Sequence, residues 1–588
     1  MNKNILTILG LLFCLIIAVG VAYSTSLHND FIWDDFFLVK DNQYIKSWEK
    51  IPKIFSEDIG AGGGVELYEG GKAKYGYYRP LQILTYLVDY SIWGVNPIGF
   101  HLSNTLFHLL TSFSIFFLIL ILFKDKLISF LTALLFAIHP IHTEAVSYIS
   151  GRADSLAVIF MILAFIFYIK FIEAPKNIFL IGTILSYLLA LLSRENTLFF
   201  PVIILIYHYT FKKNINKKIF ASVLTMILFY IAIRLTLLKH IFPDAVSIGE
   251  IPLENRLPGF FTAVFNYIKL LFWPAGLHME YVPWKFSYFA KGAVIGAIII
   301  VLIILGAITA RKKNPRIFFA LTWFFLLLIP VSNCLYPVHA YMREHWLYLP
   351  SIGFFLMISC GFAVLLRKKI MKYFAGIFLI CLTIFFIIMT REQNSYWKDM
   401  ISFCQKTLLY EPYYAKMHYM LGNGLSQKGL LKEAITSYTN AINYDKSYAD
   451  AYYNLANIYL RTGNKSMAVT CYENTIKNNP NYGKAYNNLA NLYMEKGRIT
   501  DALPLYKKTL EINPNDIYAI NNLACVYRDT GENALALDLY NKAIALAPVY
   551  PATYYNAALT YKNLGNVEMT KKYAQKWAEL SGRAPVKN

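Results

Sequence analysis

The chain has 588 residues, 56% of them hydrophobic and 16% charged, and its mean hydropathy is +0.40. A soluble domain averages about 45–50% apolar and about 25% charged residues, so this composition excludes an ordinary soluble globular protein. The net charge of +20 does not indicate nucleic-acid binding, because the basic residues gather in short turns between apolar runs and form no stripe on one soluble face.

The first apolar run, Ile5–Tyr23, is interpreted as a retained membrane anchor. It has no convincing small-x-small cleavage site, and further runs near the roughly 18–20 residues of a membrane span follow it. We therefore predict about eleven spans in a domain covering residues 1–391. The later spans are expected at His101–Phe123, Leu127–Ile138, Ser155–Ile172, Ile178–Ser193, Leu198–Phe211, Phe220–Leu238, Val294–Ala310, Ile317–Val331, Ser351–Leu366 and Tyr373–Thr390.

The basic turns predict the topology of these spans. If the N-terminus is inside, every basic turn falls on the cytoplasmic side, as membrane proteins prefer. The turns are Lys124–Lys126, Lys212–Lys218, Arg311–Arg316 and Arg367–Lys372. Phe260–Leu277 is apolar but contains Pro274 and polar residues, so we expect a re-entrant or interfacial helix there. Lys, Asn and Ile usage favours a multi-pass protein of a prokaryotic cytoplasmic membrane.

A 34-residue repeat follows residue 391. The stretches "AYYNLANIYLRTGN" and "AYNNLANLYMEKGR" are near copies. Glycine recurs at this step at Gly429, Gly463, Gly497, Gly531 and Gly565. The order of Leu-Ala, Tyr, Gly, Ala and Pro at this period resembles the tetratricopeptide repeat. The expected fold class is therefore all-α: a polytopic membrane helix bundle, then a tetratricopeptide-repeat solenoid over residues 392–588 on the extracytoplasmic side.

One asparagine recurs in the first helix of successive repeats. The positions are Asn454, Asn488, Asn522 and Asn556, which we call the asparagine ladder. Such helices line the concave face of a solenoid, where amides can hold an extended peptide backbone. The alternative is that the amides satisfy hydrogen bonds between helices. The repeats alone resemble the arm of O-GlcNAc transferase, in which an asparagine ladder holds the acceptor.

Ionisable residues gather in the loops predicted to face outside. The longest loop, 24–100, contains Asp34, Asp35 and Arg79. The others contribute His139, His142, Glu144, Arg152, Asp154, Arg194, His339, Tyr341 and Arg343. Because ionisable groups beside membrane helices are costly unless they line a cavity or do chemistry, we expect a functional site on this face.

The loop motifs resemble a known family. An acidic pair after the first span, a long first outer loop and about eleven spans resemble the GT-C superfamily of glycosyltransferases, which use polyprenyl-phosphate sugars. More narrowly, "WDD", "YYRPL", "GFHLSNTLFHLL", "HPIHTEAVSYISGRADSLA" and "LLSRENTLFFP" with trailing repeats resemble the TMTC family of O-mannosyltransferases. Protein O-mannosyltransferases are more distantly similar.

The resemblance implies roles for the outer residues. One member of the Asp34–Asp35 pair would be the catalytic base, and we favour Asp35. Glu144 is a second acid or an acceptor-side partner. Arginines suit the leaving phosphate, and Arg152, Arg194 and Arg343 are the candidates. At least one of them is expected in a structural ion pair, since Glu195 adjoins Arg194 and Glu344 adjoins Arg343. The expected substrate-binding residues are Arg79, His142, Asp154, His339 and Tyr341.

The expected cofactor is none, although Asp34, Asp35 and Glu144 could hold a divalent cation. Related O-mannosyltransferases work without a metal, whereas oligosaccharyltransferases need one. The expected reaction is inverting transfer of a sugar from a polyprenyl-phosphate donor to Ser or Thr hydroxyls of exported proteins held by the repeats. Two alternatives stay open. One is a non-enzymatic membrane-anchored scaffold, and the other is a transferase that acts on a lipid or glycan.

Overall fold

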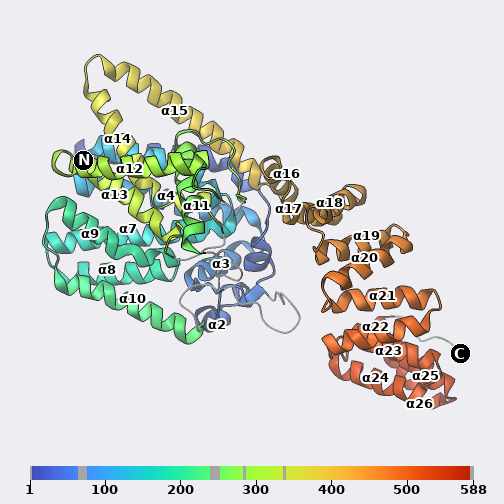
Figure 1. Ribbon diagram of the computed structural model, residues 1–588. Coiled ribbons are helices and arrows are strands. Elements are labelled where there is room, and N and C mark those ends of the chain that lie inside the picture. Colours follow the sequence, from blue (N-terminus) through green and yellow to red (C-terminus); the bar gives the residue numbers. More distant parts are fainter. Residues whose placement is uncertain (1–2, 64–75, 239–251, 283–285, 336–339, 583–588) are drawn as a thin grey trace. The chain divides into compact units, whose positions relative to one another are not determined.

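The computed structural model describes residues 3–63, 76–238, 252–282, 286–335 and 340–582. The chain forms two compact units, one ending at Pro412 and the other beginning at Tyr413. Every regular element in the described residues is a helix, as the sequence predicts (Figure 1). Residues 392–412, which the sequence places with the repeats, pack with the membrane unit.

The helices of the first unit follow the apolar runs closely. They are α1 (Lys3–Tyr23), α2 (Ile51–Ser56), α3 (Pro80–Trp93), α4 (Pro97–Phe123), α5 (Lys126–Ile138), α6 (Thr143–Val146), α7 (Arg152–Glu173), α8 (Asn177–Leu191), α9 (Phe200–Phe211), α10 (Lys217–Leu237), α11 (Leu253–Phe272), α12 (Lys291–Lys313), α13 (Pro315–Leu328), α14 (Ser351–Arg367), α15 (Met371–Asn394) and α16 (Met400–Tyr410). Each expected span is therefore a helix.

Fewer of these helices are long enough to cross a membrane than the sequence predicts. Among the described residues, six helices (α1, α4, α7, α10, α12 and α15, some with a short extension) meet the length and apolarity of a span. The pair α5 and α6, bent by 58°, would make a seventh. The expected count of about eleven is not reached, because α8, α9, α13 and α14 have only 15, 12, 14 and 17 residues, against roughly 20 for a full crossing.

The segment expected to be re-entrant or interfacial forms α11, which packs along α12. Gly296 of α12 makes this approach possible, since a Cβ at that position would lie 1.8 Å from the carbonyl oxygen of Phe261. Only glycine allows two helix backbones to come this close.

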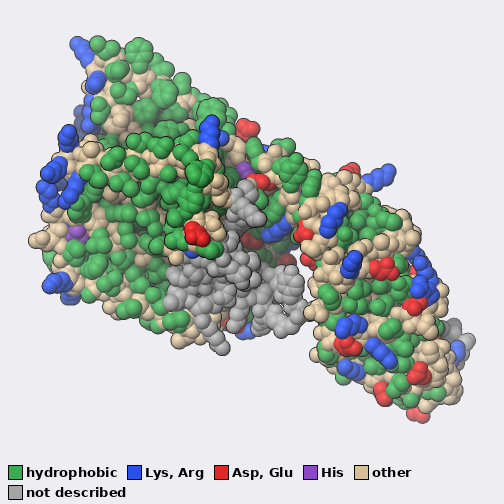
Figure 2. Space-filling view, viewed as in Figure 1, with side chains coloured by type: hydrophobic (Ala, Val, Ile, Leu, Met, Phe, Trp, Pro, Cys, Tyr) green, Lys and Arg blue, Asp and Glu red, His purple; other side chains and the backbone are tan. Residues whose placement is uncertain are grey.

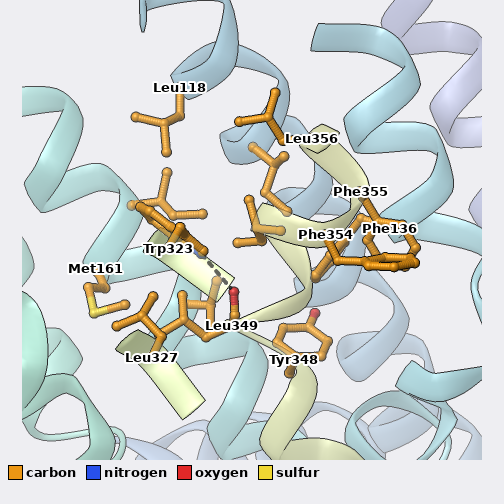
Figure 3. Close-up of a cluster of buried hydrophobic side chains, with 14 of the residues drawn as sticks. Leu118, Phe136, Met161, Trp323, Leu327, Tyr348, Leu349, Phe354, Phe355 and Leu356 are labelled. Carbon is orange, nitrogen blue, oxygen red and sulfur yellow. Dashed lines mark hydrogen bonds between the residues drawn. The ribbon is translucent and has the colours of Figure 1, made fainter. Parts of the chain in front are cut away.

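The core of the bundle lies between its helices. Side chains from α4, α5, α7, α13 and α14 meet there around Trp323, whose indole nitrogen donates to the carbonyl of Leu349 at 3.0 Å (Figure 3). Tyr348, just before α14, lies in the same core, and its hydroxyl is 2.7 Å from Nδ1 of His108. This packing fixes the end of the loop that enters α14.

The second unit is a stack of antiparallel helix pairs. Its helices are α17 (Ala415–Gln427), α18 (Leu431–Tyr444), α19 (Ala449–Arg461), α20 (Lys465–Asn478), α21 (Gly483–Glu495), α22 (Ile499–Ile512), α23 (Ile517–Asp529), α24 (Asn533–Leu546), α25 (Pro551–Asn563) and α26 (Val567–Ser581). The glycine after the first helix of each pair has a left-handed backbone, as at Gly463 with φ 82°, which ends the helix and turns the chain.

Candidate active site

The acidic pair lies in an irregular turn after α1. Trp33 has φ 46°, a conformation that bulky residues rarely adopt. Phe36–Lys40, immediately after the pair, forms one turn of π-helix. Left-handed bulky residues and π-turns are frequent at functional sites, so the turn is built unlike an ordinary connecting loop.

Asp35 is completely buried and its two carboxylate oxygens accept hydrogen bonds. Ser150 donates to Oδ1 from its backbone nitrogen (2.9 Å) and its hydroxyl (2.5 Å), and the backbone nitrogen of Ile32 donates to Oδ2 (3.1 Å). Burial raises the pKa of Asp35 to about 7, and the neighbouring charge of Asp34 adds to this shift. Asp35 therefore ties the turn to the loop at residue 150.

Asp34 lies differently from its neighbour. It is half-buried, and its backbone nitrogen donates to the hydroxyl of Tyr148 at 3.2 Å. The Tyr148 ring stacks on Trp397 with centroids 5.3 Å apart. The start of the linker after α15 therefore packs against the acidic turn, and a further bond joins the backbone nitrogen of Asp30 to the carbonyl of Lys398 at 2.8 Å.

Glu144 is also buried and is held by one residue of the loop before α14. Its Oε1 is 2.6 Å from Nδ1 of His345, and the His345 backbone nitrogen donates to Oε2 at 3.0 Å. The turn after Glu144 is tight, because a Cβ on Gly151 would lie 2.3 Å from the Glu144 carbonyl oxygen. The segment 144–150 thus connects the acidic turn, through Ser150, with the loop at residue 345.

Glu344, which the sequence suggested as an ion-pair partner of the adjoining Arg343, belongs to the same region, but Arg343 pairs with Glu280 instead. The Glu344 carboxylate accepts from the backbone nitrogen of His278 and from the Tyr281 hydroxyl, both at 2.6 Å. Burial, reinforced by the charge of Glu144, raises the pKa of Glu344 well above its usual range. Glu344, its donors His278 and Tyr281, and Glu144 come from three separate loops. Their spacing in the sequence therefore gave no signal that they interact.

The three arginines expected to meet the donor phosphate all form ion pairs, but not with the adjoining glutamates. Arg194 pairs with Asp154, and Arg343 with Glu280 at 3.1 Å. Arg194 and Arg343 keep 12% and 17% of their side-chain surface exposed. Both therefore sit at the edge of the protein interior, where a ligand can reach them.

Arg152 is fully buried, which argues against the expected phosphate contact. Its guanidinium pairs with Asp89 at 2.5 Å. It also donates to the side-chain oxygen of Asn104 at 2.6 Å and to the carbonyl of Phe100 at 3.0 Å. Because its donors point into α3 and α4, Arg152 binds these helices to α7.

Glu195 joins two further arginines. Its carboxylate lies 3.0 Å from Arg79 and 3.0 Å from Arg234. Burial would raise the pKa of Glu195, but the two cations outweigh it and lower the pKa. Sequence reasoning missed Arg234, although a lone cation inside the apolar run of α10 is itself a signal of a buried site.

Three arginines act on the Tyr77 hydroxyl. Burial raises the pKa of Tyr77, and the charges of Arg79, Arg194 and Arg343 oppose this shift. Only Arg79 is in contact with the ring, with its guanidinium 4.5 Å from the ring centre. The convergence of these three cations on one donor site stays a prediction, whereas Arg152 is fully buried inside the bundle. The cavity beside Arg79, between α2, α3 and the loop at Tyr44, is only about 10 Å³, room for about one water and not for a sugar.

The remaining expected substrate-binding residues lie in different surroundings. His142 is fully buried, with its ring 4.3 Å from that of Phe136 and 4.9 Å from that of Tyr348; it belongs to the core. Asp154 is occupied by Arg194. The Tyr341 ring packs on Phe286 at 4.7 Å. His339 lies outside the described residues.

The carboxylates considered as metal ligands do not form a ligand set. Asp35 accepts three hydrogen bonds from Ile32 and Ser150, and Glu144 is held by His345. Their oxygens are therefore committed to N–H and O–H donors from separate loops. The arrangement does not fit a divalent cation shared between Asp34, Asp35 and Glu144.

The asparagine ladder forms a hydrogen-bonded network between repeats. The side-chain nitrogen of Asn454 donates to Asn423 at 2.9 Å, and that of Asn522 donates to Asn491 at 3.0 Å. The acceptor asparagine also receives a tyrosine hydroxyl, as from Tyr506 to Asn491 at 2.5 Å. The ladder amides thus make inter-helix bonds, which was the alternative interpretation.

Curated relatives of the chain are named protein O-mannosyl-transferases. Protein O-mannosyl-transferase TMTC3 of Mus musculus is 26% identical over 458 residues, covering 71% of this chain and 49% of the relative. F38B6.6 of Caenorhabditis elegans is 27% identical over 440 residues, covering 71% and 60%. TMTC2 of Homo sapiens is 40% identical over 159 residues, covering 26% and 18%. The chain spans about half the length of the curated relatives it matches. The predicted resemblance to TMTC O-mannosyltransferases is confirmed.

The repeats match known repeat models. Tetratricopeptide repeat models match residues 449–482, 481–548 and 551–582, and a TPR repeat model matches residues 411–463. The crystal structure of YrrB, described as a TPR protein with an unusual peptide-binding site, is 23% identical and covers 30% of this chain and 92% of that chain, with a TM-score of 0.28. The repeat prediction is confirmed by the family models.

Proposed function

We propose that this chain transfers a sugar from a polyprenyl-phosphate donor to Ser or Thr hydroxyls of exported proteins, as the names of its relatives indicate for mannose. The observation that carries the proposal is that charged groups from separate loops of the bundle act on one another. The Arg79 guanidinium lies 4.5 Å from the centre of the Tyr77 ring. The charges of Arg194 and Arg343 also act on the Tyr77 hydroxyl, and Arg343 acts on Glu144. Cations for a leaving phosphate and carboxylates for proton transfer are therefore available together.

The geometry favours Asp34 over Asp35 as the base. Asp35, which we favoured from the sequence, is fully buried, and both its oxygens are occupied by donors from Ile32 and Ser150. Asp34 is half-buried in the same turn. Asp35 then holds the turn in place, and Asp34 receives the proton.

The reaction is a direct displacement at the anomeric carbon. The acceptor hydroxyl oxygen bonds to this carbon, its proton passes to the Asp34 carboxylate, and the bond to the phosphate oxygen breaks. The lipid phosphate leaves toward Arg79, Arg194 and Arg343, whose own carboxylate partners hold the guanidinium groups in position. Attack opposite the leaving group inverts the anomeric centre. The multi-pass bundle provides the route for the lipid tail, and the repeats hold the protein acceptor.

Replacement of single carboxylates in intact membranes tests the proposal. Asp34→Asn should lower transfer about 10²–10⁴-fold, the usual contribution of a general base. Asp41→Asn, an exposed acid of the same turn, should leave it unchanged. The measurement is mass spectrometry of hexose on exported proteins, with expression matched between variants.

The result also separates the two alternatives. Unchanged glycans in Asp34→Asn membranes would contradict the transferase and favour the scaffold. Loss of a glycolipid or glycan product, with protein-bound hexose intact, would favour transfer to a lipid or glycan acceptor.

A further inference from the structure

A groove of about 500 Å³ opens where α4, α9 and α12 end and α13 begins. These helix ends are the ones that carry the basic turns. Two kinds of side chain line it. Leu122, Phe123 and Phe211 form an apolar wall, and Lys212, Lys313 and Arg316 supply cations. Figure 2 shows Lys and Arg side chains gathered at this left-hand edge of the first unit.

The cations of the groove are poorly neutralised. Lys212 and Lys313 are exposed, and the structure gives them no carboxylate partner within the described residues. Arg316 is half-buried, with its guanidinium 5.8 Å from the centre of the Phe123 ring and 3.5 Å from Asp125. Asp125 lies closer to Arg367, at 2.6 Å. One carboxylate thus serves two arginines, and the groove keeps a net positive charge.

The combination of charges and apolar wall suits an amphipathic anion. A free phosphate would need only the cations, whereas the Leu122, Phe123 and Phe211 wall offers contact to hydrocarbon. The groove lies at helix ends, where a span leaves the bilayer, and basic pockets between membrane helices bind acidic lipid head groups. We propose that this groove binds the phosphate head group of an anionic membrane phospholipid, with the start of its acyl chains against the aromatic wall.

Lipid titration of the purified full chain tests this site. The probes are phosphatidylglycerol and phosphatidylcholine with the same acyl chains, and glycerol 3-phosphate as the head group without chains; binding is followed by native mass spectrometry. The variant Lys212→Asn with Lys313→Gln removes two groove charges. Asparagine suits position 212, where φ is 49°. The control, Lys217→Gln with Lys218→Gln, removes two charges from the start of α10, outside the groove lining.

Wild-type and control chains should prefer phosphatidylglycerol, and the groove variant should bind it about 30-fold more weakly, as expected for two surface charges. Phosphatidylcholine binding should be equal in all three. Equal weakening in the control would show a general charge effect and overturn the site. Glycerol 3-phosphate binding as tight as the lipid would assign the groove to a free phosphate and also overturn the proposal. The unfolding temperature of each variant confirms that the bundle is intact.

Discussion

The two units bury their polar side chains in different ways. In the membrane unit some of the buried polar groups are charged and paired between helices, as between Arg152 of α7 and Asp89 of α3. In the repeat unit they are neutral amides and hydroxyls, joined at 34-residue steps, as from Asn522 to Asn491. An ion pair in an apolar interior is costly when broken, whereas a neutral bond costs less. In the first unit a single broken ion pair should therefore cost much stability, whereas in the second unit each broken hydrogen bond should cost little.

The largest expected effect comes from breaking a buried ion pair. Arg152→Met leaves the Asp89 carboxylate buried without its cation, and should lower the stability of the first unit by about 3–5 kcal/mol. Arg367→Met, which removes an exposed partner of Asp125, should cost less than about 1 kcal/mol. The measurement is thermal unfolding of the full chain in detergent, followed by tryptophan fluorescence.

A second substitution separates lost charge pairing from lost packing. Arg152→Met with Asp89→Leu removes both charges and should recover more than half of the lost stability. If the double variant were no more stable than Arg152→Met, the hydrogen bonds of Arg152 to Asn104 and Phe100 would carry the effect, and the comparison between charged and neutral networks would fail.

A smaller effect should appear in the pH dependence of stability. Burial raises the pKa of Asp35 to about 7, so the folded chain binds this proton more tightly than the unfolded chain does. The resulting stabilisation is complete below about pH 4 and is lost as the pH rises through about 7. Relative to Asp35→Asn, the wild-type chain should lose on the order of 2–4 kcal/mol across this window.

Thermal unfolding of the two chains between pH 4 and 8 measures this difference. Asp41→Asn, with an exposed carboxylate in the same turn, should follow the wild-type curve. Parallel curves for wild type and Asp35→Asn would contradict the buried acid and would restore Asp35 as an accessible candidate for the base.

The difference between the units also explains how far sequence reasoning reached. The apolar runs and the 34-residue step predicted the helices of both units, because periodicity and hydropathy are local properties. Among the described residues, fewer helices than predicted have the length of a full span, because apolarity alone does not show where a helix such as α9, with 12 residues, ends.

The pairing of charged residues is not a local property. Glu195 adjoins Arg194 in the sequence, yet pairs with Arg79, which precedes α3, and with Arg234 of α10. The sequence predicted that Arg79, Arg194 and Arg343 face the same side, but not that Arg152 is closed off inside the bundle. Whether a cation points inward or to a ligand depends on helix rotation and loop packing, which the motifs do not encode.

The smallest effect should come from the neutral network. Asn488 donates to the hydroxyls of Tyr453 and Tyr472, both at 3.3 Å, so Asn488→Ala should cost about 0.5–1.5 kcal/mol. Asn487 is a common partner of two ladder residues, since it accepts from Asn522 and donates to Asn488. Asn454 instead donates to Tyr419 and Asn423.

Sharing of partners predicts which pairs of substitutions couple. Asn454→Ala and Asn522→Ala have no common partner and should add, whereas Asn488→Ala and Asn522→Ala should deviate from additivity. Hydrogen–deuterium exchange of residues 449–563 in the full chain measures each effect locally. Equal coupling in both pairs would mean that strain spreads along the whole stack. Removing a bond that holds two repeats together should raise hydrogen exchange in both repeats. Unchanged exchange in every variant, together with loss of acceptor glycosylation, would therefore assign the ladder to peptide binding alone.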